Sequence, residues 1–222
     1  MSAVPEDLTG RARLRDAAIE CFAAGGFEES LRAIAARAGV SAGLVRHHFG
    51  SKELLRTECD ATVLERYRKL KTDSIGVEPA TLFAQFPSSR EAGILLVYIL
   101  RSVRDGGAAG RVFLERMVQE ALEFTKAAVA SGLVVPSRDE KARVRCLIHQ
   151  AIGGLIVYFA MRPDTPLDDF TSVMEQFYAE TILPTLEIYT EGIFTGRSYL
   201  ETYLEYAAGT NTTPADLAGG TQ

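Results

Sequence analysis

The amino-acid sequence predicts an all-α protein in which a three-helix helix-turn-helix domain precedes a larger helical domain. Near the amino-terminal end, two short helical patterns stand on either side of a Gly-Val-Ser turn. Over most of the remaining chain, apolar residues recur at three- and four-residue intervals, which is the period of a helix. With 222 residues and 47% hydrophobic content, the chain can build a substantial core. We expect a first domain over residues 1–50, a second over residues 51–208 and a flexible tail over residues 209–222.

The helix-turn-helix is predicted between Ser30 and Lys52. A first helix from Thr9 to about Gly25 closes the domain core, and the second helix ends at Gly39, where a glycine adopts the left-handed conformation without a Cβ clash. Ser41 then stands where its side-chain oxygen can cap the third helix, and Ser51 repeats this arrangement for the fourth. The third helix is therefore confined to residues 42–48.

The third helix presents two kinds of surface. Val45 and Phe49 share one face and can close the small core. The other faces carry Ala42, Gly43, Leu44, Arg46, His47 and His48. A short helix with Arg, His and small residues suits the major groove of DNA, which is wide enough for a helix and presents base-edge acceptors. An ordinary helical hairpin with a solvated polar face has the same local pattern, so this signal alone leaves both interpretations open.

A longer match separates the two interpretations. The matching positions are Ala17-Ala18-Ile19, Phe22, Gly26-Phe27, Ile34-Ala35, residues 37–41 (RAGVS), Gly43, His48-Phe49 and residues 51–54 (SKEL). At these positions the chain resembles the amino-terminal domain of the TetR family of bacterial transcription regulators, from about Thr9 to Lys52. Two departures stand out. Leu44, Val45 and Arg46 replace the usual Thr, Leu and Tyr, and the loop between Phe27 and Leu31 is one residue shorter, so the resemblance does not carry over an operator sequence.

The predicted DNA-binding surface combines groove-facing and phosphate-facing residues. Its members are Arg32, Ser41, Ala42, Gly43, Leu44, Arg46, His47, His48 and Lys52. Arg32 lies at a helix start, where backbone amides also favour anions, and Lys52 matches a family position that contacts phosphate. Arg46 can donate to guanine or to a phosphate, and the sequence leaves both open. Arg11, Arg13 and Arg15 either reach the phosphate backbone or form a solvated first turn.

The charge distribution is compatible with DNA only at the amino-terminal end. The formal net charge is −5, but residues 1–70 carry 11 Lys or Arg and 10 Asp or Glu, a net of +1. The remainder carries 13 and 19, a net of −6. Sequence-specific binding needs a few placed cations rather than a basic domain, because phosphate contacts supply affinity and groove contacts supply sequence choice.

The second domain is predicted to be helical throughout. We expect helices over residues 51–71, 82–86, 90–104, 109–130, 139–161, 167–190 and 193–207. The helix over 51–71 would be a rod of about 30 Å that connects the domains, and the helix over 90–104 is apolar on nearly all sides, as expected of a central buried helix. Gly153-Gly154 indicates a close helix approach, and Pro184 should kink or interrupt its helix.

The resemblance implies that the second domain binds a small-molecule effector and forms a homodimer. The aromatic and polar candidates for the effector pocket are Phe83, Phe86, Tyr98, Phe113, Met117, Phe124, His149 and Phe177. These residues fill a core equally well, and a core position is the preferred interpretation for His149. The candidates for the dimer interface are Leu147, Ala151, Gly154, Leu155, Tyr158, Met174, Phe177 and Tyr178.

Several classes of site and location are disfavoured. No Gly-rich phosphate loop, HExxH, CxxC or GxSxG occurs, so we expect neither catalysis, nor a metal, nor a cofactor. Cys21, Cys59 and Cys146 lie within apolar patterns and are predicted to be buried free thiols. The start MSAVPEDLTG lacks the order of a signal peptide, and no segment approaches the roughly 20 apolar residues of a membrane span. We expect a cytoplasmic protein.

The favoured hypothesis is a dimeric, ligand-responsive regulator of double-stranded DNA. By resemblance it is a repressor that leaves a palindromic operator when a largely apolar effector binds, and two recognition helices related by a two-fold axis would lie about 34 to 36 Å apart. Two other functions remain open. One is an architectural DNA-binding protein without a ligand, and the other is a small-molecule-binding protein with a vestigial helix-turn-helix.

Overall fold

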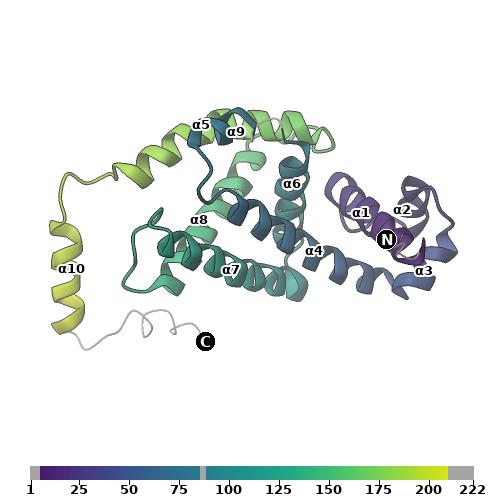
Figure 1. Ribbon diagram of the computed structural model, residues 1–222, viewed down its shortest axis with the longest axis horizontal. Coiled ribbons are helices and arrows are strands. Elements are labelled where there is room, and N and C mark those ends of the chain that lie inside the picture. The colour runs from purple at the N-terminus through teal and green to yellow at the C-terminus, as the bar shows by residue number, and fades with distance from the viewer. Residues whose placement is uncertain (1–5, 86–88, 210–222) are drawn as a thin grey trace. The chain divides into compact units, whose positions relative to one another are not determined.

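The computed structural model describes residues 6–85 and 89–209, and these residues form helices and loops only. The helices are α1 (Glu6–Gly25), α2 (Leu31–Ala38), α3 (Ala42–Phe49), α4 (Lys52–Asp73), α5 (Pro79–Gln85), α6 (Arg90–Asp105), α7 (Gly107–Ala130), α8 (Glu140–Ala160), α9 (Phe170–Thr190) and α10 (Ser198–Gly209) (Figure 1). The chain divides into two compact units, residues 1–178 and residues 179–222. The all-α prediction is confirmed.

The turn between α2 and α3 has the predicted geometry. Gly39 has φ 68° and ψ 33°, which is the left-handed conformation. The N–H of Val40 donates to the carbonyl of Ala35 at 3.0 Å and the N–H of Gly39 donates to that of Ala36 at 3.1 Å. These two bonds satisfy carbonyls that the helix end leaves unpaired. At the other end of α2, the Ser30 Oγ accepts the N–H of Ala33.

Helices α1, α2 and α3 pack around one small core. Its fully enclosed side chains include Leu14, Phe22, Ile34 and Val45, each no more than 1% exposed. Burying side chains of this size stabilises the fold by about 1.5–3 kcal/mol each. Because α1 starts at Glu6, the predicted start at Thr9 is three residues late.

Helix α6 lies at the centre of the larger part of the first unit. It contacts α1, α4, α7 and α8, and the residues buried along it are Ala92, Gly93, Ile94, Leu95, Val97, Tyr98, Ile99, Leu100 and Ser102. The prediction of a central buried helix is confirmed. A Cβ atom at Gly93 would lie 2.0 Å from the Phe170 carbonyl oxygen, so this glycine permits the close approach of the start of α9.

Three predictions concern the later helices, and the one for Cys146 is wrong. Neither Gly153 nor Gly154 has a described atom within 4 Å of an added Cβ, so they do not mark a close approach within the described chain. Pro184 lies inside α9, which continues to Thr190 without interruption. Cys146 is exposed, although Cys59 is buried as predicted.

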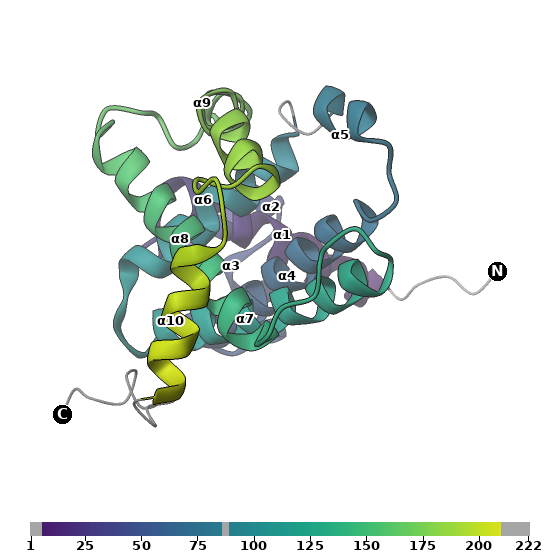
Figure 2. The same ribbon diagram turned by 90° about the vertical axis from the view of Figure 1, so that its left-hand side faces the viewer.

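The second unit contains the end of α9 from Ala179 and the whole of α10. Figure 2 shows α10 along its length. None of the described residues 179–209 is buried. Among the described residues of the whole chain, no helix is long and apolar enough to span a membrane.

Candidate nucleic-acid interface

Helix α3 is held against the core by one face and leaves the other faces open. Val45 is 1% exposed and Phe49 is 5% exposed, so both point inward as predicted. Arg46 and His47 are exposed on the opposite side, next to the exposed backbone of Ala42 and Gly43. Leu44 is half-buried and packs against the core. The open surface of α3 therefore carries Arg46 and His47 beside the small Ala42 and Gly43, which suits entry into a groove.

The start of α3 differs from the prediction in one respect. Ser41 occupies the N-cap position with φ −77° and ψ 148°, but its side chain makes no cap hydrogen bond. The expected bond from the Ser41 oxygen is therefore absent, whereas Ser51 does accept the N–H of Leu54 at 3.2 Å. Ser41 is exposed, so its hydroxyl and the first amides of α3 face the solvent together, which favours an anion such as a phosphate.

The predicted phosphate-contacting residues lie on three helices, α2, α3 and α4. Arg32 is exposed in the first turn of α2, and Lys52 is half-buried at the first position of α4. His48 is half-buried, and its Nε2 lies 3.7 Å from the place where a Cβ of Gly10 would stand, so the ring lies against α1. Their contacts with DNA remain predictions.

Arg11 contacts the end of α3 and holds it against α4, and these contacts were not predicted from the sequence. Its guanidinium lies over the Phe49 ring at 4.6 Å, donates to the His48 carbonyl at 2.5 Å and forms an ion pair with Glu58 of α4. Arg15 is also engaged, with Asp16 on its own helix. Of the three early arginines, Arg13 is the exposed one. Spacing along one helix cannot show which of its arginines meets a partner from α3 or α4.

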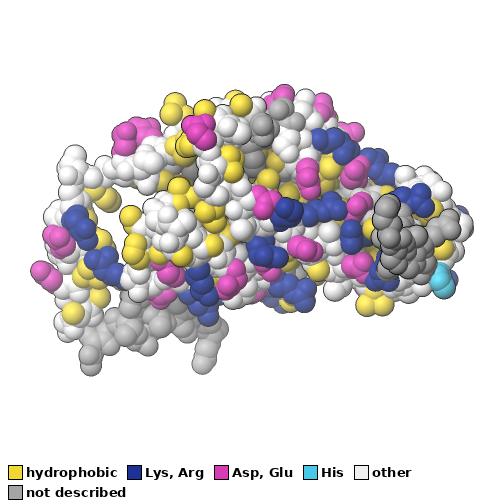
Figure 3. Space-filling model, viewed as in Figure 1, with side chains coloured by type: hydrophobic (Ala, Val, Ile, Leu, Met, Phe, Trp, Pro, Cys, Tyr) yellow, Lys and Arg dark blue, Asp and Glu magenta, His cyan; other side chains and the backbone are white. Residues whose placement is uncertain are grey.

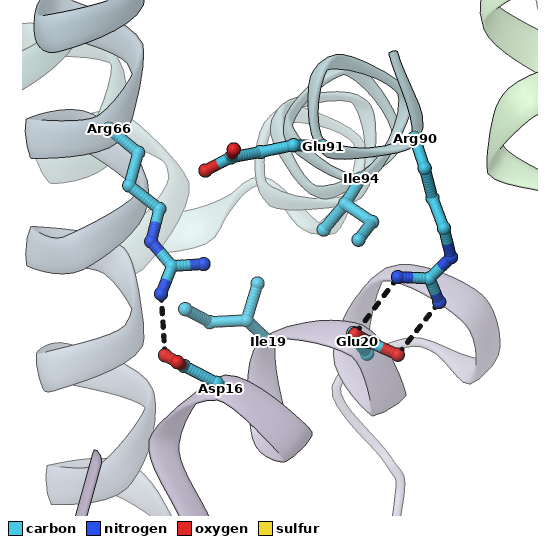
Figure 4. Close-up of a pocket in the computed structure, with 7 residues that line it drawn as sticks. All are labelled: Asp16, Ile19, Glu20, Arg66, Arg90, Glu91 and Ile94. Atoms are coloured by element: carbon cyan, nitrogen blue, oxygen red, sulfur yellow. Dashed lines mark hydrogen bonds and ion pairs between the residues drawn. The ribbon is translucent and has the colours of Figure 1, made fainter. Parts of the chain in front are cut away.

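A charged groove separates the three-helix domain from α6 and α4. It has a volume of about 510 Å³ and is lined by Asp16, Ile19, Glu20, Arg66, Arg90, Glu91 and Ile94. Figure 4 shows two ion pairs across it. Arg90 of α6 donates to both carboxylate oxygens of Glu20 at 3.1 and 2.9 Å, and Arg66 of α4 donates to Asp16 at 2.6 Å. The hydrogen bonds from Arg90, together with those from Arg37, lower the pKa of Glu20 to about 2.

Two further arginines join α1 to the larger part of the unit. Arg101 of α6 donates to the carbonyls of Ala23 and Ala24 at 3.1 and 2.7 Å, and so caps the end of α1. Arg56 of α4 lies over the Phe27 ring at 3.6 Å and donates to Asp105 at 2.8 Å. We call the contacts of α1 and Phe27 with α4 and α6 the junction.

Tyr98 lies in the core of the junction. Its side chain is 0% exposed, its OH donates to Asp60 Oδ1 at 2.7 Å, and its ring meets that of Phe27 edge-on at 5.5 Å. Burial raises the pKa of Asp60, although the Tyr98 hydrogen bond opposes this shift. Tyr98 was predicted to line an effector pocket, and in the structure its ring joins the three-helix domain to α4.

The other predicted pocket residues do not form one group. Phe113 and Met117 are buried beside Tyr98 in the core, whereas Phe83 is 46% exposed on α5. The rest are placed as follows: Phe124 is half-buried with its ring 6.0 Å from that of Tyr67, Phe177 is half-buried against Tyr158, and Phe86 lies outside the described residues.

His149 is exposed, so the preferred core interpretation is wrong. It lines an open depression of about 500 Å³ on α8. The other residues lining this depression are Ala142, Arg145, Cys146 and Gln150, all from the same helix. Because one helix supplies the whole lining, the depression is a shallow surface feature rather than an enclosed pocket.

The predicted dimer residues divide by exposure. Ala151 and Gly154 are exposed, Leu147, Tyr158, Phe177 and Tyr178 are half-buried, and Leu155 and Met174 are buried in the chain's own core. Val157 and Met161 were not predicted, yet they are 62% and 75% exposed. They follow Gly154 at three and seven residues, so the helical period alone identifies them as neighbours on the same face.

Two family models match the chain. The one described as "Bacterial regulatory proteins, tetR family" covers residues 14–59, which include α2 and α3. The one described as "Tetracyclin repressor-like, C-terminal domain" covers residues 91–195.

Individual proteins agree with these models. The HTH-type transcriptional regulatory protein RaaS of Mycobacterium tuberculosis is 40% identical over 202 residues, which is 90% of this chain and 94% of RaaS. Among solved structures, FadR of Bacillus subtilis in complex with stearoyl-CoA has a TM-score of 0.52 at 17% identity over 82% of this chain and 99% of FadR. Salmonella enterica GusR has a TM-score of 0.50 at 19% identity over 79% of this chain and 96% of GusR. The chain belongs to the TetR family and is a DNA-binding transcriptional regulator.

Proposed function

We propose that the protein is a cytoplasmic homodimeric repressor that binds a palindromic operator and leaves it when a largely apolar small molecule binds the helical domain. The observation that carries the DNA-binding part is the surface of α3. Its buried Val45 and Phe49 fix the helix, while Arg46 and His47 remain exposed on the opposite side. In a two-fold dimer, two such helices about 34 Å apart would enter successive major grooves.

Residues around α3 have complementary roles in this proposal. Arg46 and His47 read base edges, with Ala42 and Gly43 allowing close approach, and Ser41, Arg32 and Lys52 hold the phosphates. Arg11 keeps the end of α3 in place through the His48 carbonyl and Phe49, without touching DNA itself. A bidentate contact from an arginine to guanine contributes about 1–3 kcal/mol of discrimination between bases.

The test of this assignment is a gel-shift series on DNA from upstream of the protein's own gene. For Arg46→Ala we expect weaker binding to the specific site and a smaller preference over a scrambled site. Arg32→Ala should weaken binding to both DNAs alike and reduce the salt dependence. Arg111→Ala, which removes an exposed arginine from α7, is the matched control and should change neither. Equal affinity for specific and scrambled DNA in the unmodified protein would instead support the architectural function.

Effector release is proposed to act through the junction. Glu20, Asp16, Ala23 and Phe27 of the three-helix domain are all held by side chains of α4 and α6. A ligand that favours another position of α6 or α4 therefore changes the position of α1 and, with it, the spacing of the two α3 helices. A ligand changes this equilibrium only by its differential affinity for the two states.

Stearoyl-CoA is the first probe, because a similar fold was solved with that molecule. We expect a long-chain acyl compound to raise the melting temperature of the protein and to lower its affinity for the operator. Unesterified coenzyme A is the control, since it lacks the apolar chain. Two results together would refute the effector part of the proposal. No apolar ligand would change the affinity for the operator, and a truncated amino-terminal domain would bind the operator as the whole protein does.

A further inference from the structure

The described residues 179–209, which we call the C-terminal arm, have no core of their own. None of them is buried. Among the described residues of the chain, 18 large hydrophobic side chains are exposed, and 11 of these lie between Leu183 and Tyr206. Monomeric proteins rarely expose apolar surface at this density, and where they do the surface usually binds another molecule.

Helix α10 is amphipathic, and the side chains of its apolar face are exposed. Tyr199, Leu200, Tyr203 and Leu204 follow one another at helical spacing on one face and are 36–70% exposed. Glu201 lies on the opposite side, where it forms an ion pair with Arg197 at 3.8 Å. A helix of 12 residues is marginal by itself in water. It needs packing on its apolar face to be stable.

The same surface continues from α10 towards the end of α9. The rings of Phe194 and Tyr199 contact each other at a tilt, with their centroids 4.7 Å apart, although Phe194 is still 64% exposed and Tyr199 70% exposed. Before them lie Leu183 and Ile193, which are 72% and 76% exposed. Figure 3 shows hydrophobic side chains at the surface of α10.

Charge argues for a protein partner rather than a membrane or DNA. The described arm contains five glutamates (Glu180, Glu187, Glu191, Glu201 and Glu205) and one arginine (Arg197), a net charge of −4. Such a segment repels anionic lipids and phosphates, because the charges have the same sign. Amphipathic helices that bind membrane surfaces are instead typically rich in Lys and Arg. Tyrosine, which is prominent on the arm, is enriched in the centres of protein interfaces.

The area and the symmetry favour a second copy of this chain. Eleven side chains of this size, each more than a third exposed, amount to an apolar surface on the order of 1,000 Å² per copy. A stable interface needs about 800 Å² per partner. A two-fold contact of the arm with itself buries apolar against apolar surface and leaves the glutamates outside.

We propose that the apolar face of α10 packs against the same face of a second copy, adding a contact to the dimer. This inference rests on the proposed homodimer and extends it. Helix α10 begins at Ser198, after the end of the family-model match at residue 195, so this contact lies beyond the part of the chain that the family model describes.

Cross-linking through a single introduced cysteine tests the contact directly. In a Cys146→Ser background, which removes the exposed native thiol, Tyr203→Cys places a thiol on the apolar face and Glu205→Cys places one on the polar face. We expect mild oxidation to produce a covalent dimer at least fivefold faster for Tyr203→Cys. One cysteine at this position cannot link to itself within a chain, so the product reports a second copy. The background without an added cysteine is the blank.

Sedimentation equilibrium of the full chain supplies the second measurement. The double variant Tyr199→Ser/Tyr203→Ser should raise the dimer dissociation constant at least tenfold, because aromatic side chains dominate interface energies. Glu201→Gln/Glu205→Gln, on the other side of the same helix, should leave it within threefold. Far-UV circular dichroism of each variant checks that the remaining helices are retained.

The possible outcomes separate this inference from the proposed function. If the protein is a dimer that binds its operator, yet Tyr203→Cys does not cross-link and the serine variant dimerises normally, the arm contact is wrong and the proposed function stands. A chain that is monomeric at all concentrations and binds no operator refutes both. If Tyr203→Cys does not cross-link and the unmodified protein floats with phosphatidylcholine vesicles, the occupant is a membrane and the inference is overturned.

Discussion

The junction and the C-terminal arm contain similar kinds of residue but use them in opposite ways. In the junction, the Tyr98 ring is enclosed and its OH has a partner in Asp60, while arginines from α4 and α6 meet acids or carbonyls of α1. In the arm, Tyr199 and Tyr203 are 70% and 46% exposed. The aromatic side chains of the junction are enclosed, whereas those of the arm are exposed, and we propose that a second copy covers the part on α10.

The two regions therefore stabilise different states of the protein: the junction stabilises the folded chain, and the arm offers surface for association. Enclosed rings with satisfied polar atoms stabilise the folded chain at any concentration. Exposed rings stabilise only a complex, so their contribution depends on protein concentration. A set of substitutions in the two regions therefore separates folding from association.

The largest expected effect comes from removing the enclosed ring. Tyr98→Ala should lower the free energy of unfolding by about 3–5 kcal/mol, because a cavity replaces a fully buried aromatic side chain. Tyr199→Ala removes the same ring from an exposed position and should cost less than about 1 kcal/mol. Urea denaturation of both variants at equal protein concentration measures the two losses. Similar losses would show that the two regions do not differ in the proposed way.

A smaller effect is expected from the Tyr98 hydroxyl alone. Tyr98→Phe leaves the half-buried Asp60 without its donor, which should cost about 1–3 kcal/mol. Burial raises the pKa of Asp60 in the folded chain, so its ionised form is the unfavourable one and the penalty grows as pH rises through that pKa. The loss should therefore be larger at neutral than at acidic pH, as unfolding at several pH values would show. Adding Asp60→Asn should remove this pH dependence, and a dependence that persists would contradict the assignment.

The ion pair of Glu20 should make the junction sensitive to acid. Its pKa is lowered from 4.5 to about 2 in the folded chain by the hydrogen bonds from Arg90 and Arg37. The stabilisation is therefore fully present above pH 4.5 and is lost as pH falls towards 2. Because the carboxylate is partly exposed, solvent screening reduces the contribution to about 1 kcal/mol. Glu20→Gln should lower the free energy of unfolding by this amount at neutral pH and by little near pH 2, as urea denaturation at several pH values would show. A loss that is the same at every pH would indicate a packing effect instead.

The smallest effect is expected for an ion pair of the arm. Arg197 and Glu201 are 3.8 Å apart and their side chains are 70% and 63% exposed. Pairs of this kind contribute about 0.5 kcal/mol or less. Arg197→Ala should therefore leave both the melting temperature and the dimer dissociation constant nearly unchanged. A marked rise in the dissociation constant would place the polar side of α10 in the interface.

Most of the helices could be predicted from periodicity and capping residues. Gly39 and Ser51 set the ends of α2 and the start of α4 as expected, because these signals act within a few residues along the chain. Two other local signals did not have the expected consequence. Ser41 occupies its cap position without making the cap bond, and the small Gly153 and Gly154 meet nothing in the described chain.

Which residues of α3 point inward and which point outward could also be predicted from the sequence. The helical period alone places Val45 and Phe49 on one face and Arg46 and His47 elsewhere. The effector candidates were not accessible in this way. An enclosed Tyr98 and an exposed Phe83 have the same apolar pattern in the sequence, and only the packing of α6 against α4 and the three-helix domain distinguishes them.

The helical class, the helix-turn-helix and the family could be predicted from the sequence alone, because local hydrogen bonding and periodic burial depend on residues that are close along the chain. The tertiary structure was needed to show that Arg90, Arg66 and Arg101 bind α1, since these partners lie 50 to 78 positions apart. It also decided that the C-terminal arm has no buried residue. An apolar helical face looks the same in sequence whether its own chain or a second copy covers it, because the hydrophobic effect depends on area removed from water and not on whose surface removes it.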